Sequence, residues 1–507
     1  MYRMANSRIG LVVFAVAAVV GLGAPTTARA QNLDVVRIGE IDFRSCPAGQ
    51  LSQIVGTREV LCGEYEVYED RRAHTGRRIG LKITVVPALD PDEGPRQPPV
   101  FPLAGGPGES AHNTAIGAYF TLRPAMATRD LVVVDIRGTG GSNPLRCDPL
   151  DQPERLQSWI YYILPLDEAR ECRERLSEAA DLTQYTTTYA ADDLNEVREA
   201  LGYERFALWG GSYGTLLGQE VIRRHGEHVE TAVLLGIAPP DMHAPMGFAR
   251  SLETTRERLV SDCRENEACR RAFPDFEADF EMMLDSARER PVTASVVSPI
   301  TREREEVSLG YGDFVMGVRF VLYNAAAAAS LPSWAASART GDYEPVMQAI
   351  SNAVFGIRQV LHYGLFLSMR CAEDLPFVDL EAERRDADGT MLGTYRIDRE
   401  LENCTVWPRA ELYSDRHRPV RSDVPVLLLS GSEDPVTPPE YGDRVASTLP
   451  NSLHVVFDNR GHGFFDPAAI ECLYTIVEPF MSKGSGDGVD ASCATRLERL
   501  PFRIEGS

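Results

Sequence analysis

The sequence predicts an α/β protein with a mostly parallel sheet flanked by helices and an inserted helical cap domain. Short apolar runs typical of strands buried in a parallel sheet lie toward both ends of the chain, at residues 131–135 (LVVVD) and 424–429 (VPVLLL). Between them, residues 245–292 and 311–369 have helical periodicity instead. Strands and helices that alternate on both sides of a helical block are typical of a parallel sheet that carries a cap.

Seven segments have the pattern of strands. Residues 80–88 (GLKITVVPA) alternate apolar and polar side chains. Residues 206–209 (FALW) run directly into two glycines and then into a predicted helix at 213–224. The other predicted strands are 100–103, 131–135, 231–235, 424–429 and 454–457.

These segments divide the chain beyond residue 30 into three parts. Residues 31–240 and 411–507 are predicted to form the two halves of one core. Residues 241–410, where the helical stretches lie, are predicted to form the cap.

The composition excludes several classes of protein. Hydrophobic residues make up 44% of the 507 residues, which is near the average for globular proteins and excludes fibrous and disordered chains. The formal net charge of −22 argues against a nucleic-acid partner, because a polyanion needs a basic surface to bind.

The first thirty residues have the features of a secretory signal peptide. Arg3 and Arg8 precede an apolar run at residues 9–22, and Ala28-Arg29-Ala30 resembles a cleavage site. The apolar run is shorter than the roughly 20 residues that span a bilayer, and no later stretch is long and apolar enough to do so. We therefore expect cleavage near Ala30 and a mature chain without a membrane anchor, in the periplasm or outside the cell.

The ten cysteines favour disulfides, because an exported protein meets an oxidising compartment. No C-x-x-C or cysteine–histidine cluster supports a zinc site, and no cysteine lies on a glycine-rich turn beside a base. We predict bridges between sequence neighbours, although spacing alone leaves the connectivity open. The predicted pairs are Cys46 and Cys62, Cys147 and Cys172, Cys263 and Cys269, Cys371 and Cys404, and Cys472 and Cys493.

A G-x-S-x-G motif at residues 210–214 (GGSYG) places Ser212 between a predicted strand and a predicted helix. This context is typical of a nucleophile elbow, where flanking glycines allow a sharp turn that exposes the serine hydroxyl. The following helix N-terminus favours developing negative charge. A passive serine on an ordinary glycine-rich turn is the alternative.

A nucleophilic serine needs a base, and the base needs a carboxylate that orients it. In this architecture the chain order is serine, acid, histidine. Asp434 follows the predicted strand at 424–429, and His462 follows the next predicted strand at 454–457. Because loops at the carboxyl ends of neighbouring parallel strands lie close together, we predict that Ser212, Asp434 and His462 form a catalytic triad.

Other residues of suitable type fit less well. Glu433 is next to Asp434, but its side chain should point elsewhere on the loop. His454 begins a predicted strand, which is typical of a structural histidine, and His225 and His228 follow the end of the helix after Ser212. The two glycines that flank His462 favour a functional loop.

An oxyanion hole needs two backbone N–H groups. One candidate is the amide of Tyr213, the residue after the nucleophile. The other is Gly106, in the loop 103–108 (LAGGPG) after an early predicted strand, where glycines allow close approach of the backbone. A second glycine-rich turn, at residues 135–142 (DIRGTGGS), lacks dinucleotide-binding spacing, and we expect it to brace the active-site loops.

Taken together, these motifs resemble one family, the α/β-hydrolase serine aminopeptidases, in the branch of the proline iminopeptidases and tripeptidyl aminopeptidases. The resemblance rests on five motifs: G-G-P-G at 105–108, D-x-R-G-x-G-x-S at 135–142, G-G-S-Y-G at 210–214, G-x-x-D-x-x-x-P around Asp434 and G-H-G around His462. It implies an α/β-hydrolase fold and the release of N-terminal residues or short peptides.

Details of the sequence place the chain within this branch. The cysteines 263 and 269 in the cap make it more similar to the secreted tripeptidyl aminopeptidases. Proline iminopeptidases usually have histidine where this chain has Ala104, so proline preference stays open.

The family resemblance also implies a carboxylate that binds the substrate's free amine. The segment Cys371-Ala372-Glu373-Asp374, where the cap should return to the core, resembles the amine-binding segment of the family. Glu373 is the first candidate and Asp374 the second. A solvated acidic turn is the alternative.

The sequence thus predicts a secreted serine hydrolase that acts on a peptide or a small ester and needs no cofactor or metal. The first hypothesis is an aminopeptidase. A secreted carboxylesterase or lipase with the same triad is the second, because fold does not fix the substrate. A non-catalytic binding protein on a hydrolase core is the third.

Overall fold

The structure is a computed structural model that describes residues 35–46, 59–89, 97–464 and 466–504. Every described residue belongs to one compact unit, Val35–Ser507. The predicted signal peptide, residues 1–30, lies outside the described residues.

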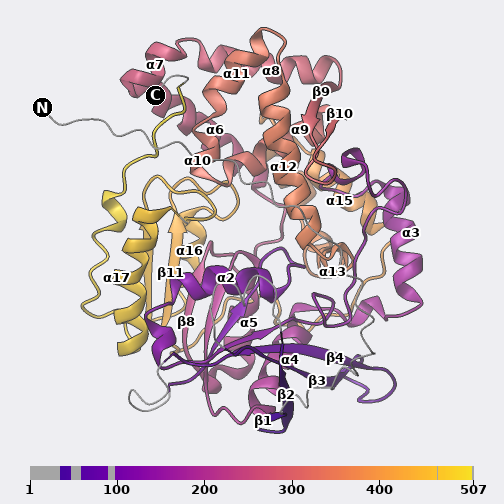
Figure 1. The fold of residues 1–507 in the computed structure, drawn as a ribbon, viewed down its shortest axis with the longest axis vertical. Coiled ribbons are helices and arrows are strands. Elements are labelled where there is room, and N and C mark those ends of the chain that lie inside the picture. The colour runs from indigo at the N-terminus through magenta and orange to yellow at the C-terminus, as the bar shows by residue number, and fades with distance from the viewer. Residues whose placement is uncertain (1–34, 47–58, 90–96, 465, 505–507) are drawn as a thin grey trace, which may run out of the picture. The chain divides into compact units, whose positions relative to one another are not determined.

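Among the described residues, ten strands form one sheet in the order β1-β2-β3-β4-β6-β5-β7-β8-β11-β12 (Figure 1). Strands β1 to β4 are antiparallel, and β4 pairs antiparallel with β6. From β6 to β12 all pairs are parallel, so their carboxyl ends lie at one edge. The strands are β1 (Val36–Ile38), β2 (Ile41–Ser45), β3 (Leu61–Tyr68), β4 (Arg78–Val86), β5 (Val100–Leu103), β6 (Leu131–Val134), β7 (Phe206–Gly211), β8 (Val229–Leu235), β11 (Val426–Gly431) and β12 (Ser452–Phe457).

Helices cover both faces of the parallel strands. Successive side chains of a strand point to opposite faces, and in β7 Leu208 packs in one apolar cluster while Trp209 packs in another. The cluster of Leu208 includes helices α4 (Thr187–Ala200) and α5 (Tyr213–His225), and that of Trp209 includes α2 (Ala111–Thr121) and α17 (Pro467–Lys483). Burial on both faces explains why these strands are continuous apolar runs.

The segment between β8 and β11 is mostly helical, and Figure 1 shows its helices grouped together beyond one end of the sheet strands. It contains α6 (Phe248–Glu265), α7 (Glu267–Ala272), α8 (Phe276–Glu289), α9 (Tyr311–Leu322), α10 (Ala325–Ala328), α11 (Leu331–Arg339), α12 (Glu344–Val360), α13 (Tyr363–Met369), α14 (Leu380–Ala387) and α15 (Tyr395–Cys404). An antiparallel hairpin of β9 (Val292–Val297) and β10 (Arg304–Leu309) in this segment was not predicted from the sequence, and neither were strands β1 to β3 of the main sheet. The domain boundaries at 241 and 410 stay a prediction.

The length and hydrophobicity of the helices determine whether any of them could span a membrane. No single helix among the described residues is long and apolar enough to span a bilayer. Helices Tyr311–Leu322 and Ala325–Arg339 pass the length and composition test only as a pair, and they are bent by 115°.

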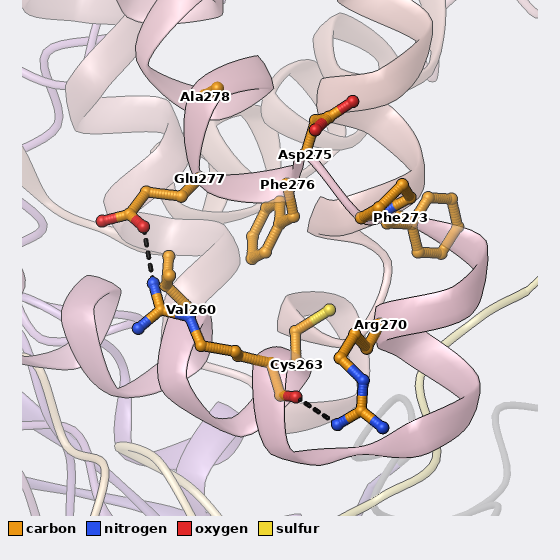
Figure 2. A pocket seen from close by; sticks show the side chains of 10 residues that line it. Val260, Cys263, Arg270, Phe273, Asp275, Phe276, Glu277 and Ala278 are labelled. Atoms are coloured by element: carbon orange, nitrogen blue, oxygen red, sulfur yellow. Dashed lines mark hydrogen bonds and ion pairs between the residues drawn. The ribbon is translucent and has the colours of Figure 1, made fainter.

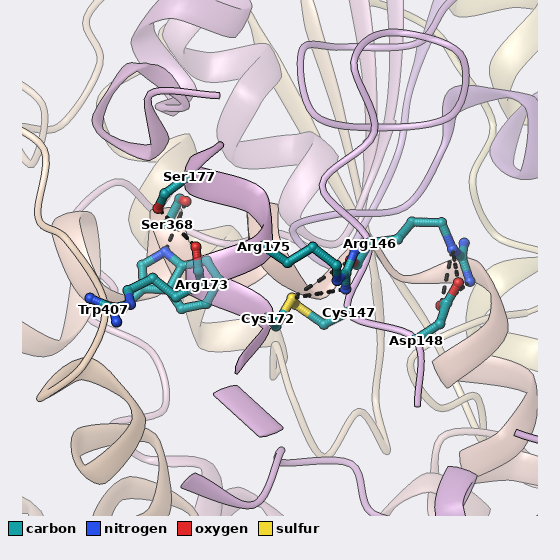
Figure 3. Close-up of a disulfide and its surroundings, with 9 residues drawn as sticks. All are labelled: Arg146, Cys147, Asp148, Cys172, Arg173, Arg175, Ser177, Ser368 and Trp407. Atoms are coloured by element: carbon teal, nitrogen blue, oxygen red, sulfur yellow. Dashed lines mark hydrogen bonds and ion pairs between the residues drawn. A yellow bond between two sulfur atoms is a disulfide. The ribbon is translucent and has the colours of Figure 1, made fainter. Parts of the chain in front are cut away.

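All ten cysteines pair with a sequence neighbour: Cys46 with Cys62, Cys147 with Cys172, Cys263 with Cys269, Cys371 with Cys404, and Cys472 with Cys493. The bridge between Cys147 and Cys172 ties the loop after β6 to helix α3 (Leu166–Ser177) (Figure 3). Next to it, the Arg146 guanidinium binds the Asp148 carboxylate at 2.7 Å. Such a bridge stabilises the fold by restricting the unfolded chain.

The turn after β6 braces the loop that follows β5, as the sequence predicts. Asp135 accepts hydrogen bonds from Ser110 Oγ at 2.6 Å and from the Gly141 amide at 3.0 Å, and its Oδ1 lies 3.1 Å from His112 Nδ1. Arg137, fully buried, binds both carboxylate oxygens of Asp193 at 2.6 and 2.9 Å. Ser110 and His112 lie two and four residues beyond the glycine loop at 105–108, so this turn holds the chain where that loop ends.

Replacing Asp135 by Asn should lower the free energy of unfolding at neutral pH. Burial alone raises the pKa of Asp135, but the hydrogen bond and charge of His112, with Ser110 and the Gly141 amide, outweigh it and hold the pKa at about 2. Since the folded pKa lies below the unfolded one, the ionised carboxylate contributes about 2 kcal/mol above pH ~4, and this is lost as pH falls toward ~2.

Denaturant unfolding of both proteins across this pH range measures the effect. The difference between wild type and Asp135→Asn should shrink in acid. As a control, Asp167→Asn changes a side chain that is 87% exposed and should alter stability by less than about 0.5 kcal/mol. A difference for Asp135→Asn that does not depend on pH would contradict the prediction.

Candidate active site

Ser212 occupies a sharp turn between β7 and α5. Its backbone has φ 55° and ψ −122°, a region that costs a non-glycine residue about 1–3 kcal/mol and that surrounding structure must enforce. The two glycines of the motif allow close contacts: a Cβ at Gly210 would lie 2.6 Å from the Gly214 oxygen, and a Cβ at Gly214 would lie 2.2 Å from the Leu103 oxygen. The turn therefore needs glycine at both positions.

Asp434 and His462 meet at the ends of the neighbouring strands β11 and β12. His462 Nδ1 lies 2.8 Å from Asp434 Oδ2. The other oxygen of Asp434, which is 4% exposed, accepts hydrogen bonds from the amides of Val436 and Thr437 at 2.7 and 2.9 Å. With Oδ1 occupied in this way, Oδ2 is held toward the histidine.

Thr437 also contacts both residues, a role that the sequence analysis did not assign. Its hydroxyl donates to Asp434 Oδ2 at 2.7 Å and lies 3.3 Å from His462 Nδ1. The available signal was its position three residues after an acid on a loop, where hydroxyl side chains commonly bond to nearby groups.

The His462 loop is fixed from the cap side. The His462 amide donates to the Tyr323 carbonyl at 3.1 Å, and the two rings pack edge to face with centroids 5.1 Å apart. A Cβ at Gly461 would lie 2.6 Å from the Tyr323 oxygen. The cap thus holds the ring of His462 through Tyr323.

Ser212 and His462 line the same cavity. Within the described residues, no hydrogen bond joins the Ser212 hydroxyl to the His462 ring. Catalytic hydrogen bonds commonly tighten only when substrate is bound. The absence of this bond therefore does not argue against Ser212 and His462 as nucleophile and base.

The alternative acid and bases have other partners. Glu433 binds Arg499 Nη2 at 2.6 Å and lies 3.4 Å from Arg258. His454 bonds to Ser430 at 2.9 Å and to Asp443 at 2.8 Å. Both are therefore engaged in structural contacts away from Ser212.

The two predicted oxyanion donors border the nucleophile. Gly106 and Tyr213 line a cavity together with Ser212. Gly106 has φ 109°, and a Cβ there would lie 2.7 Å from the Gly108 amide, so only glycine fits. Tyr213 is the first residue of α5, where backbone N–H groups are unpaired by the helix itself.

Glu373 lies behind this site rather than in it. It is 2% exposed, and its carboxylate accepts hydrogen bonds from the Thr187 amide and hydroxyl at 2.6 and 2.7 Å and from Arg416 at 2.6 and 2.9 Å. Thr187 in turn bonds to the Tyr213 hydroxyl at 2.9 Å. This geometry does not support the prediction that Glu373 binds a substrate amine, because Arg416 already neutralises it.

Asp374 reaches the site instead. It lines the same small cavity, of about 80 Å³, as Ser212 and Tyr213. Its carboxylate binds Arg370 at 2.5 Å. Burial raises the pKa of Asp374 to about 6, and the positive charge of Arg370 lowers it only in part. Arg370, which also binds Glu400, and Arg396 line the same cavity, so Asp374 borders the nucleophile as a member of a charged cluster.

A second and larger cavity opens from Ser212 on the side of His462. Its volume is about 680 Å³. Its lining residues are mainly apolar and include Phe120, Tyr162 and Phe320. A further cavity of about 380 Å³ lies within the cap, and Figure 2 shows Cys263, Phe273 and Phe276 around it. It contains none of the predicted catalytic residues, so the site is where the first two cavities meet.

Two family models match parts of the chain. One, described as an alpha/beta hydrolase fold, matches residues 98–272, and one described as a TAP-like protein matches residues 390–493. The first match contains Ser212, and the second contains Asp434 and His462.

Curated proteins show the same relationship. The serine protease Hip1 of Mycobacterium tuberculosis (strain ATCC 25618 / H37Rv) is 24% identical over 449 residues, which cover 79% of this chain and 81% of that protein. A tripeptidyl aminopeptidase of Streptomyces coelicolor is 28% identical over 200 residues, 36% of each chain. A probable proline iminopeptidase of the same organism is 28% identical over 144 residues, 28% of this chain and 34% of that protein. With the fold described above, these matches identify the chain as a serine hydrolase of the α/β-hydrolase family, in the branch that contains these peptidases.

Proposed function

We propose that the protein is an aminopeptidase that works through Ser212, Asp434 and His462 and an acyl-enzyme. The observation that carries this proposal is the His462–Asp434 hydrogen bond of 2.8 Å beside a nucleophile elbow. The smaller cavity, which Asp374 lines, supplies a carboxylate near the point of attack.

In the first step, His462 accepts the proton of the Ser212 hydroxyl as the oxygen attacks the scissile carbonyl. The amides of Gly106 and Tyr213 bind the oxyanion, and Asp434 stabilises the imidazolium. His462 then donates the proton to the leaving amine. Water, activated by the same histidine, releases the acyl fragment.

The free amine of the substrate needs a counter-charge. A buried carboxylate next to the nucleophile can bind the substrate ammonium, because the ion pair compensates both charges when substrate binding displaces water from the site. Asp374 lines the cavity beside Ser212, whereas Glu373 is absent from its lining and binds Arg416 at 2.6 Å. We therefore assign the amine to Asp374.

A secreted carboxylesterase is the alternative, and one observation favours it. The larger cavity has mostly apolar walls, which suit the alkyl or acyl group of an ester as well as a peptide side chain. The same triad hydrolyses both classes of substrate.

We also propose that the protein acts after export. Its five disulfides support this, because such bonds persist in oxidising compartments. The apolar run at residues 9–22 followed by Ala28-Arg29-Ala30 supplies the sequence features of a cleaved signal.

Three substrates separate the two activities: a free-amine aminoacyl or tripeptidyl fluorogenic amide, its N-acetylated twin, and a short-chain nitrophenyl ester. We expect hydrolysis of the free-amine amide and loss of it on acetylation, with Ser212→Ala as the blank. Hydrolysis of the ester alone would replace the aminopeptidase with the carboxylesterase.

Replacing Asp434 by Asn should lower kcat by about 10⁴-fold, because the amide no longer holds the histidine in the tautomer that accepts a proton. A steady-state assay measures this. Glu433→Asn changes the neighbouring acid and should leave kcat within about tenfold, because Glu433 binds Arg499 instead. Equal losses in the two variants would show that the loop, not the carboxylate, was disturbed.

The role of Asp374 predicts a pH effect that depends on the substrate. As pH falls through about 6, Asp374 takes up a proton and loses the charge that holds an ammonium. The ratio of kcat/KM for a free-amine amide to that for an uncharged ester should therefore fall in acid, whereas protonation of the histidine affects both alike.

In Asp374→Asn this ratio should be about 10- to 100-fold lower at neutral pH and independent of pH. Thermal unfolding of the variant controls for damage from loss of the Asp374–Arg370 ion pair. A ratio that still varied with pH in Asp374→Asn would place the amine elsewhere.

A further inference from the structure

Glu109 is an acidic residue at the active site that has no role in the proposed mechanism. It follows the glycine loop at 105–108, is half-buried, and lines the larger cavity together with Ser212 and His462. No arginine or lysine among the described residues pairs with its carboxylate. The sequence analysis did not single it out, although it directly follows the predicted oxyanion loop.

The carboxylate lies close to the nucleophile. A Cβ placed on Gly105 would be 3.4 Å from Glu109 Oε2 and 3.4 Å from Ser212 Cβ. The distance from Glu109 Oε2 to Ser212 Cβ therefore cannot exceed the sum of these two distances. A group bound by Glu109 belongs to a residue adjacent to the scissile bond, since one residue of extended chain spans about 3.5 Å.

The surroundings leave the charge of Glu109 poorly compensated. Burial raises the pKa of Glu109, and the charge of His462 and the Gly105 amide lower it only in part. Among the described residues that line the larger cavity, Glu109 is the only acid. An incoming cation would supply the missing partner.

The walls of the cavity fit the rest of a long cationic side chain. Phe120, Tyr162, Phe320, Ile357 and Leu361 line it. Lysine and arginine carry a charged group on an apolar stem, which packs along such surfaces while the charged tip meets a polar partner. Aromatic rings also attract cations.

The position of His462 indicates that the larger cavity binds the leaving group. In the proposed mechanism His462 protonates the leaving amine, so the residue after the scissile bond must lie beside the histidine. His462 lines the larger cavity, whereas Tyr213 and Asp374 line the smaller one. The acyl part of the substrate therefore belongs in the smaller cavity.

We propose that Glu109 makes the larger cavity a specificity site for lysine or arginine at the residue immediately after the scissile bond. This inference rests on the proposed peptidase function and adds to it the class of substrate on the leaving-group side.

The test uses two peptides that differ at one position. Mass spectrometry of products from the wild-type protein first locates the cleaved bond, and the next residue is then made lysine or norleucine, its uncharged counterpart of similar length. The ratio of kcat/KM for the two peptides is measured for wild type, Glu109→Gln and Glu109→Asp. A ratio within each protein cancels any general loss of activity.

We expect the wild-type protein to prefer lysine by about tenfold or more, as a charge-assisted hydrogen bond allows. Glu109→Gln should bring the ratio close to one, and Glu109→Asp should keep part of the preference. Glu471→Gln is the matched control, because it removes the same charge from an exposed position on α17, which packs on α2. It should retain the wild-type ratio.

Three results would overturn the proposal. A wild-type ratio near one, or the same ratio in Glu109→Gln, would show that Glu109 does not select the residue after the bond. A loss in Glu109→Gln that depends instead on a free substrate amine would assign Glu109 to the amino terminus. If wild type cleaves esters but neither peptide, the peptidase function itself fails, and the inference falls with it.

Discussion

The backbone turn at Ser212 is the constraint on which the rest of the site depends. A serine at φ 55° persists only if its neighbours hold it there. Here β7 leads into the turn and α5 leads out of it, and a Cβ at Gly214 would approach the Leu103 oxygen at 2.2 Å. The turn is thus in direct contact with the end of β5, from which the glycine loop starts. Nucleophile and oxyanion loop are fixed relative to each other by backbone packing.

Charged groups around this turn are distributed in two ways. Behind the site, Glu373 with Arg416 and Glu400 with Arg370 form buried pairs at 2.6 and 2.7 Å. Such pairs contribute little net stability but are costly to break, so they hold the cap segment in one arrangement. Facing the cavities, Asp374 binds Arg370 at 2.5 Å, and Glu109 is the only acid among the described residues that line the larger cavity. This division separates carboxylates that shape the protein from carboxylates that are available to a substrate.

The sequence predicts strands β4 to β8, β11 and β12 and the chain order of the site because each depends on local signals, whereas strands β1 to β3 were not predicted. Apolar runs mark β6 and β11, and Asp434 and His462 lie in the loops that follow β11 and β12. Other features depend on partners far away in the chain: Glu373 fits an amine-binding acid in sequence, yet Arg416 lies 43 residues later and neutralises it. The hairpin β9–β10 was not predicted, although the side chains of β9 alternate between more and less buried positions. Whether an acidic side chain faces a cavity depends on how the folded chain packs around it, and the spacing of residues in the sequence does not reveal this.

In the proposed mechanism, the amino-terminal part of a peptide acylates Ser212. Acid quenching during turnover, followed by proteolysis and mass spectrometry, tests it most directly. The fragment containing Ser212 should gain the mass of the substrate's amino-terminal residue or residues, with the free amine intact, and His462→Ala should abolish this adduct. An adduct on another residue, or none while peptide is still cleaved, would contradict the account.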